Sequence, residues 1–524
     1  MQKGVPLYYV RYQVYNQFIP YPAAIMPKTE QTYSFATQTE ILGFLNELEE
    51  RFPVNQWKCD GVHIWPLIRL RLAGFLLWGN SNQSNSSEKK QNSKNRNVLY
   101  KVWNNLYKLV FSTKYFFWWL SIPKRRILFV GADHYRQETD GVRKNKFFDP
   151  LIERYDLDNF CWLDIGKTTN NPSWPNKGLD FHRGSLRFLK FRSLLRSIGL
   201  NKLPNIQLEE YENFLNFLQT NNETDLFTKA YSLEKLKSEI IQWHDYFVLF
   251  NRFLDKVEPA RILLLCYFDL PRMALIAAAN LKKITLTEIQ HGTVDSIYYK
   301  NWLSLPKNGY DMLPRNYWCW DRFSKQTIDE WAAEHSLYRV FVGGNPWVAY
   351  WNDKDAGFDS DDPIILYTLQ DLEPEDAFPK AIIQAIQETD ETWYIRFHPN
   401  FLHLWERTDN FLQENGLHGK IKLKEAFELP LAVLLKHAKL HVSAYSSSSM
   451  EAALFGIHTI FLDRRTEDWF PSLYHQKFCT FLNANEPFFL KRFKNIRKNT
   501  EKKNGSELIR NIDMKAIEWS LNIE

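Results

Sequence analysis

Short apolar runs alternate with helix-forming stretches along most of this 524-residue chain. Four of these runs cover residues 126–131, 260–268, 363–369 and 393–399. A strand that is apolar on both faces has to be covered on both faces, and parallel strands connected by helices meet this requirement. Because one hydrophobic core cannot organise a chain of this length, the pattern predicts an α/β protein. We expect two Rossmann-like domains facing a cleft, plus a small N-terminal unit.

Changes in composition suggest where these parts begin and end. Residues 80–97 contain no apolar side chain and cannot pack, so they are expected to be a disordered linker. The predicted order is an N-terminal unit (1–79), the linker (80–97), an aromatic and basic helix (98–125), a first Rossmann-like domain (126–337), a second one (338–506) and a C-terminal helix (507–524) that crosses back to the first.

Charge and cysteine content exclude several classes of protein. The net charge is only +5, from 66 basic and 61 acidic residues, and no nucleic-acid-binding motif is visible, so we expect no nucleic-acid partner. The five cysteines form no CxxC pair, which argues against a disulfide framework or a structural zinc. The first residues lack the uninterrupted apolar stretch of a signal peptide, so a cytoplasmic location is expected.

The segment 98–126 is rich in aromatic and basic residues. Polar interruptions such as Lys101 and Lys108 argue against a membrane-spanning helix. Either the segment lies flat on a membrane, with Phe116, Trp118 and Trp119 at headgroup depth, or it packs against the next domain. The first alternative predicts a protein on the inner face of the cytoplasmic membrane.

Four consecutive serines, Ser446, Ser447, Ser448 and Ser449, lie between an expected strand and an expected helix. Backbone N–H groups, hydroxyls and the helix dipole at such a turn attract an anion. The structural alternative is a capping box, in which Ser448 and Glu451 satisfy the first turn of the helix and no ligand is needed.

Candidate bases follow the expected strands of the first domain. Glu138 and Asp140 lie in GADHYRQETDG, directly after the strand 126–131, and His291 lies in EIQHGT, after the strand 285–289. A carboxylate or an imidazole at this position can remove a proton from a bound hydroxyl. Each also has a structural explanation, because Asp140 and Gly141 form an ordinary turn sequence and a lone histidine often belongs to the scaffold.

Candidate phosphate-binding groups follow the expected strands of the second domain. A cation, an imidazole and a helix N-terminus together would hold a phosphate ester. A phosphate-binding site in one domain and a base in the other are the groups that transfer from a nucleotide-activated donor requires. Besides the serines, the candidates are Arg396, His398 and Pro399 in RFHPN, Glu451, Asn345 in the Gly-Gly-Asn-Pro turn, and Gln370 after the strand 363–369.

The second domain resembles the nucleotide-binding domain of GT-B glycosyltransferases, and more narrowly a bacterial surface-polysaccharide group with an HP motif and a serine motif. This group contains sialyltransferase-like, capsule Kdo transferase-like and polyglycerol-phosphate transferase-like enzymes. His398-Pro399 is similar to the HP motif, and the four serines with Glu451 are similar to the serine motif. The resemblance implies that His398 and the serines bind the donor phosphate and that Glu451 holds ribose hydroxyls.

The first domain carries two further similarities to this group. The stretch 138–141 is similar to the acidic motif of the sialyltransferases, with Thr139 where an acid would stand, which implies Asp140 as the base. His291-Gly292-Thr293 is similar to the HG turn of the polyglycerol-phosphate enzymes, which implies His291 instead. The likeness covers roughly residues 126–480, and residues 1–97 have no counterpart in it.

The predicted reaction is an inverting transfer of a sugar to a hydroxyl of a glycan or lipid-linked glycan acceptor. Asp140 or His291 removes the acceptor proton, and His398, Arg396 and the serine turn neutralise the leaving nucleotide, without a metal or another cofactor. The motifs weakly favour a CMP-linked acid sugar such as Kdo or sialic acid. The alternatives are a nucleotide-sugar epimerase or hydrolase of the same fold, a polyol-phosphate transferase, or a non-catalytic scaffold of polysaccharide assembly.

Overall fold

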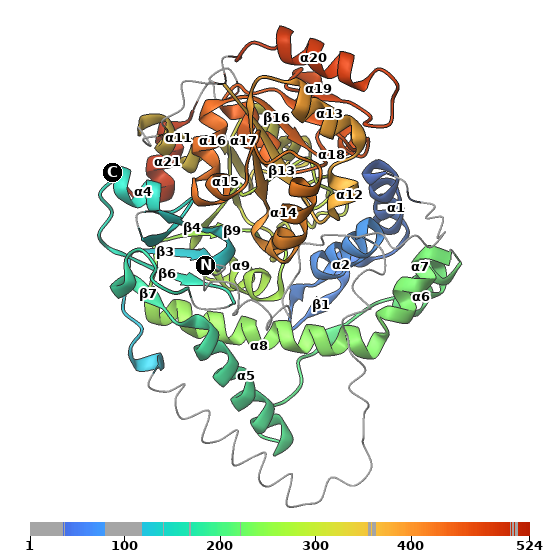
Figure 1. The fold of residues 1–524 in the computed structure, drawn as a ribbon. Coiled ribbons are helices and arrows are strands. Elements are labelled where there is room, and N and C mark those ends of the chain that lie inside the picture. Colours follow the sequence, from blue (N-terminus) through green and yellow to red (C-terminus); the bar gives the residue numbers. More distant parts are fainter. Residues whose placement is uncertain are drawn as a thin grey trace, which may run out of the picture.

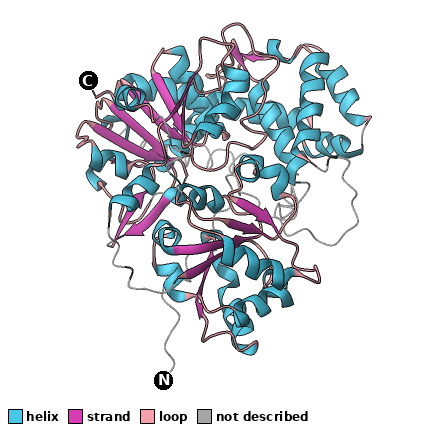
Figure 2. Cartoon of the chain, turned by 90° about the horizontal axis from the view of Figure 1, so that it is seen from above, coloured by secondary structure: helices cyan, strands magenta, loops and turns pink. Residues whose placement is uncertain are grey.

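The protein consists of two α/β domains, one above the other in Figure 1, with a smaller helical unit at their side. The structure is a computed structural model, and it describes residues 35, 37–78, 118–139, 141–166, 169–220, 222–354, 358, 363–503, 505, 508 and 512–523. Each domain contains one parallel sheet, and helices flank the strands (Figure 2). The expected fold class, two Rossmann-like domains plus a small N-terminal unit, is confirmed.

The first domain has a seven-stranded parallel sheet in the order β12-β11-β10-β9-β3-β6-β7. Its strands are β3 (Ile127–Gly131), β6 (Phe160–Asp164), β7 (Gly178–Leu179), β9 (Arg261–Leu265), β10 (Thr285–Ile289), β11 (Asn316–Cys319) and β12 (Arg339–Val342). Its main helices are α4 (Asp149–Arg154), α5 (Phe181–Ser197), α8 (Leu233–Val257), α9 (Leu270–Leu281) and α10 (Arg322–Ala332). Every residue of β3 and β6 is buried, as their apolar sequence requires. A small hairpin, β4 (Arg136–Thr139) and β5 (Val142–Asn145), is inserted directly after β3.

The second domain has a six-stranded parallel sheet in the order β15-β14-β13-β16-β17-β18. Its strands are β13 (Ile364–Leu369), β14 (Thr392–Phe397), β15 (Ile421–Lys422), β16 (Ala438–Ser443), β17 (Thr459–Phe461) and β18 (Cys479–Phe481). Its helices are α12 (Pro374–Ala377), α13 (Lys380–Glu388), α14 (Trp405–Glu414), α15 (Lys424–Glu428), α16 (Leu431–His437), α17 (Ser448–Leu454), α18 (Thr466–Trp469), α19 (Pro471–His475) and α20 (Phe489–Asn499). β13, in the middle of this sheet, is buried along its whole length.

The expected boundary at residue 338 between the two domains is wrong. The strand β12 pairs in parallel with β11 and is the edge strand of the first sheet. Gly343 N–H extends this pairing by donating to Cys319 O at 2.9 Å. The second sheet therefore begins only at β13. Strand propensity predicts that a segment is extended, but the hydrogen-bonding partner decides to which sheet it belongs.

The N-terminal unit shares its core with the first domain. It contains α1 (Gln38–Arg51), α2 (Trp65–Trp78) and the short strands β1 (Lys58–Cys59) and β2 (Val62–His63). Strand β8 (Ile206–Gln207) of the first domain pairs with β1, and α6 (Tyr211–Gln219) and α7 (Asn222–Ala230) lie beside the unit (Figure 1). The buried ion pair Arg69–Glu49, with 2.7 Å between Nε and Oε1, fixes α2 to α1.

The C-terminal helix is α21 (Met514–Leu521), which is shorter than the expected 507–524. Its first turn is capped by Asp513, whose carboxylate accepts from Ala516 N–H at 2.8 Å, and this cap explains why the helix begins where it does. The helix packs on the first domain, where Arg261 Nε donates to Trp519 O at 2.8 Å. The chain therefore crosses back to the first domain after the second sheet.

Trp118, expected at membrane headgroup depth, instead packs inside the first domain. Its ring stacks on Phe253 with the centroids 6.2 Å apart, and only 9% of its surface is exposed. Gly184 in α5 makes room for it, because a Cβ there would lie 2.5 Å from the indole ring. The headgroup placement is wrong for this residue. The linker 80–97 and residues 98–117, including Phe116, lie outside the described residues. No helix in the part of the chain that the structure describes is long and apolar enough to cross a membrane.

Trp118→Ala should lower the free energy of unfolding by about 3 kcal/mol, because the substitution leaves a cavity beside Phe253. Urea denaturation followed by circular dichroism measures this change. The control is Leu120→Ala, at a side chain that is 57% exposed, and it should change the stability by less than about 0.5 kcal/mol. An unchanged midpoint in Trp118→Ala would contradict the packing described above.

Candidate active site

Three histidines from both domains form an interdomain histidine cluster: His134 and His291 from the first domain and His398 from the second. The rings of His134 and Tyr135 lie 4.1 Å apart between centroids, and those of Tyr135 and His291 lie 5.5 Å apart. His398 contributes to lowering the pKa of His134 across the domain boundary. The carboxyl ends of β3 and β10 therefore face the carboxyl end of β14, where ligands bind in sheets of this kind.

The surroundings keep all three imidazoles neutral. Burial, followed by the charges of Arg272 and Lys146, lowers the pKa of His134 to about 3. Burial, followed by Arg272, lowers the pKa of His291 to about 3, and burial, followed by Lys146, lowers that of His398 to about 4. His134 and His398 nevertheless reach solvent. Neutral rings among fixed cations form a positive, partly desolvated surface that favours an anion.

Three cations supply this positive charge. The Nη2 of Arg272 donates to Gly131 O at 2.7 Å, its Nη1 pairs with Asp269, and its buried Nε has no partner. Arg396, in β14, donates to Leu429 O at 2.5 Å. Burial lowers the pKa of Arg396 to about 10, against the opposing charge of Glu451, so this side chain stays protonated at neutral pH. Lys146, which follows β5, is the third cation.

Glu288 forms an acid–base pair with His291 behind the cluster. Its Oε1 lies 3.9 Å from Nδ1 of His291 and accepts the Tyr299 hydroxyl at 2.7 Å, whereas its buried Oε2 has no partner. Burial raises the pKa of Glu288 to about 8. The carboxyl group therefore carries a proton at neutral pH, next to an imidazole that does not.

The serine turn is partly a self-contained structure. Ser448 Oγ donates to Ser446 Oγ at 2.8 Å, Ser449 Oγ donates to Ser446 O at 2.8 Å, and both donor residues are buried. The alternative capping box does not form, because Ser447 is the N-cap of α17 and its side chain makes no capping hydrogen bond. Ser446 and Ser447 remain solvent-accessible. Three of the four serines therefore build the turn, and Ser447 is the one that lies outside these side-chain contacts.

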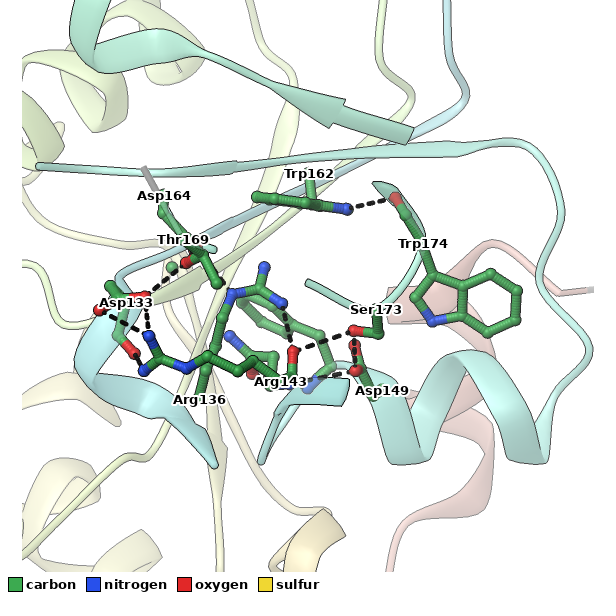
Figure 3. A network of polar contacts seen from close by, with 12 residues as sticks. Asp133, Arg136, Arg143, Asp149, Trp162, Asp164, Thr169, Ser173 and Trp174 are labelled. Carbon is green, nitrogen blue, oxygen red and sulfur yellow. Dashed lines mark hydrogen bonds and ion pairs between the residues drawn. The ribbon is translucent and has the colours of Figure 1, made fainter. Parts of the chain in front are cut away.

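The acidic residues after β3 belong mostly to a scaffold (Figure 3). Asp133 pairs with Arg143 at 2.9 Å between Oδ1 and Nη1. Asp164 pairs with Arg136 at 2.8 Å, and both side chains are almost fully buried. Glu138 is exposed on β4, outside this network, and Asp140 lies outside the described residues. Among the candidate bases that the structure describes, His291 is therefore the one that lies in the histidine cluster.

The remaining candidates occupy different positions. Asn345 caps α11 (Pro346–Asp353), accepting from Trp347 N–H at 2.9 Å, and it follows β12 of the first sheet. Gln370 follows β13 beside His398, since Leu369 pairs in register with Phe397. Pro399 opens the short helix η6 (Pro399–Leu404). Glu451 lies in α17 near Arg396, and its buried Oε2 has no partner.

The sequence analysis missed three members of this site, Lys146, Arg272 and Glu288, whereas His134 lies in the stretch GADHYRQETDG that it had singled out for candidate bases. A usable signal existed for Glu288, because it is a carboxylate inside the otherwise uncharged strand β10. Arg272 also had a signal, in the stretch DLPR that opens α9 after a buried strand. Within the described residues, no group of three or more His, Cys, Asp or Glu side chains is arranged to hold a metal, and the five cysteines are buried and free.

Comparison with known proteins gives structural similarities only. No protein-family model and no curated protein sequence matches the chain. Among solved structures, the chain is similar to MnaA of S. aureus with UDP, at 14% identity over 76% of this chain and 98% of that one, with a TM-score of 0.44. It is similar to UDP-GlcNAc 2-epimerase from Neisseria meningitidis, at 14% identity, 76% and 99% coverage, and a TM-score of 0.42. It is also similar to MurG of Acinetobacter baumannii, at 10% identity, 74% and 98% coverage, and a TM-score of 0.32. Similarities of this size do not identify a function.

Glu288→Gln should remove a pH-dependent loss of stability. A glutamate with a pKa of about 8 in the folded state and about 4.5 in the unfolded state destabilises the protein progressively as the pH rises from 4.5 to 8. At pH 8 the glutamine variant should therefore be more stable than the parent by about 3–5 kcal/mol, and the two should converge near pH 4.5. Urea unfolding at several pH values tests this. The exposed Glu212→Gln variant should follow the parent at every pH, and parallel curves for Glu288→Gln would contradict the assignment.

Proposed function

We propose that the protein is an enzyme that binds a nucleotide-activated sugar between its two domains and cleaves the bond between the anomeric carbon and the phosphate. The observation that carries this proposal is the interdomain histidine cluster with its three cations. Lys146 and Arg272 come from the first domain and Arg396 from the second, so an anion between the domains meets positive charge from both sides.

The leaving nucleotide gains negative charge as the glycosidic bond breaks. His398, Lys146 and the partly exposed Ser446 are the groups that would stabilise this charge, and donors fixed before the reaction do so without reorganisation. The buried Arg396 contributes charge rather than direct contact, because carbonyl oxygens already occupy its guanidinium.

His291 is the base that we favour over Asp140. In the free protein its low pKa leaves it unprotonated, so its nitrogen lone pair is available. A bound anion would offset the charges of Arg272 and Lys146, raise the pKa of His291 and so make it a stronger base once the substrate is in place. Glu288, protonated behind it, is a neutral partner that does not compete for the proton.

The burial of the pair favours a reaction without a bulky acceptor. The side chains of His291 and Glu288 are only 4% and 1% exposed, which suits reactions without a separate acceptor. In hydrolysis His291 would take a proton from the attacking water, and in epimerisation it would take one from the bound sugar before the bond to the phosphate forms again. Transfer to a glycan or lipid-linked hydroxyl is the second candidate, because His134 is exposed and a larger acceptor can reach it. For that transferase we keep the inverting, metal-independent mechanism, the CMP-linked acid sugar and a cytoplasmic site at the inner membrane face as proposals.

Purified protein incubated with UDP-, GDP- and CMP-sugars separates the two reactions. An epimerase or hydrolase should change or cleave its substrate without an acceptor, whereas a transferase should need one. Sugar conversion is followed by NMR and nucleotide release by chromatography. If no sugar nucleotide is turned over with or without glycan acceptors, and none raises the melting temperature, the proposal fails.

His398→Ala should lower kcat about 100-fold or more, because the leaving phosphate loses a preorganised partner. The matched control is His418→Ala, at an exposed histidine that pairs with Asp409 on the same domain, and it should keep normal activity. Unchanged kcat in His398→Ala at an unchanged melting temperature would overturn the phosphate-binding role of this residue.

A further inference from the structure

Ser446, at the start of the serine turn, has one hydrogen-bonding group left over among the contacts of the described residues. Its N–H donates to Ser443 Oγ at 3.1 Å, and its carbonyl oxygen accepts from Ser449 N–H at 3.2 Å and from Ser449 Oγ at 2.8 Å. Its own Oγ accepts twice, from Ser448 N–H at 3.2 Å and from Ser448 Oγ at 2.8 Å. A hydroxyl has two lone pairs and one proton, so only the hydroxyl proton of Ser446 remains to be used.

Ser448 imposes this arrangement on Ser446. The hydroxyl proton of Ser448 is donated to Ser446, so Ser448 Oγ can only accept from its other neighbours. These neighbours are Thr368 Oγ1 at 3.2 Å, on β13, and His441 Nε2 at 3.4 Å, on β16. All three side chains are buried. A donor to Ser448 therefore has to come from the interior of the second domain.

His441 makes that donor available in one of its two neutral forms. Burial lowers its pKa to about 3, so the ring carries a single proton; Nδ1 lies 3.0 Å from Thr459 Oγ1 and Nε2 lies 2.9 Å from Thr368 Oγ1. With the proton on Nε2, Thr459 donates to Nδ1, Nε2 donates to Thr368 and Thr368 donates to Ser448, so every contact is a hydrogen bond. With the proton on Nδ1, Thr368 would donate to Nε2, and its contact with Ser448 would join two acceptors. Buried polar groups favour the first form, which satisfies all of them.

This directed chain of hydrogen bonds ends at the carboxyl edge of the second sheet. Thr368 pairs in register with Arg396 of β14 on one side and with Ser443 of β16 on the other. His398 lies two residues beyond Arg396. Ser446 lies three residues beyond Ser443 and is partly exposed, so it and His398 follow the two strands that flank β13. A fixed hydroxyl that can only donate suits a group that only accepts, such as an ionised phosphate oxygen.

We infer that His441 is a positioning residue for the nucleotide, because through Thr368 and Ser448 it leaves the Ser446 hydroxyl as a donor to the phosphate. The inference rests on the proposed function. It adds to that function the buried residue that gives the serine turn a preference for acceptor groups. An ammonium group, which can only donate, finds no lone pair at Ser446.

Two substitutions of His441 separate this role from a purely structural one. The side-chain nitrogen of glutamine can take the place of Nε2 and that of asparagine the place of Nδ1, so His441→Gln keeps the donor towards Thr368 and His441→Asn loses it. The probes are UDP, GDP and CMP, each compared with its nucleoside by isothermal titration calorimetry. A nucleotide that binds the parent should bind His441→Gln within about three-fold of the parent and His441→Asn about ten-fold more weakly, with nucleoside binding unchanged.

Ser448→Ala is a further variant, because it removes the hydroxyl donor to Ser446 and leaves the imidazole in place. It should also weaken nucleotide binding about ten-fold. The matched control is Thr389→Val, which breaks a different buried hydrogen bond of the second domain, from Trp393 Nε1 at 2.9 Å, at the opposite end of β14. This control should lower the melting temperature and leave the nucleotide affinity unchanged.

Equal nucleotide affinities of His441→Gln and His441→Asn would overturn the inference and leave the proposed function intact, and so would parent-like binding by Ser448→Ala. An equal loss of nucleotide and nucleoside binding would overturn it too, because that loss indicates a general distortion of the domain. If none of the three nucleotides binds the parent, the proposed function fails and this inference fails with it.

Discussion

Positive charge held between two domains is the constraint on which the candidate site depends. The charges of Lys146, Arg272 and Arg396 help to keep the nearby histidines unprotonated. The domains stay together because they share an apolar core, to which Phe129 and Trp320 of the first domain and Ile364 and Ala453 of the second contribute. The burial of this shared apolar surface holds the two sheet edges that carry these charges next to each other.

Polar contacts around this core fix the orientation of the two sheets. Ser472 Oγ of α19 donates to Asp295 Oδ2, in the segment after β10, at 2.6 Å. Helix α21 returns to the first domain through Trp519. The segment of Asp295 also carries His291, so the contact that joins the domains is four residues from the favoured base. A ligand between the sheets would therefore act on elements that already connect both domains.

The sequence predicted correctly those features that a single short segment of the chain determines. The strands β9, β10, β13 and β14 lie within or close to their expected ranges, because an apolar run between turn residues specifies a buried strand locally. The motifs containing His291 and His398 were likewise recognisable as strand-end positions. Pairing is not local, so the assignment of β12 to a sheet failed. The environment of Trp118 could not be foreseen either, since aromatic side chains suit a protein core and a membrane interface equally well.

Taken alone, the sequence determined the class of fold, the approximate strands and the chemistry-bearing ends of β10, β14 and β16, because these depend on apolar period and turn residues. The tertiary structure alone decided that Glu288 is protonated beside a neutral His291 and that Arg272 and Lys146 belong to the candidate site. It also decided that the leucines in the loop after α5 are exposed. The physical reason is that pKa, desolvation and exposure are properties of the whole surrounding volume. Residues distant in the chain surround each of these groups, and no local sequence pattern indicates which residues they are.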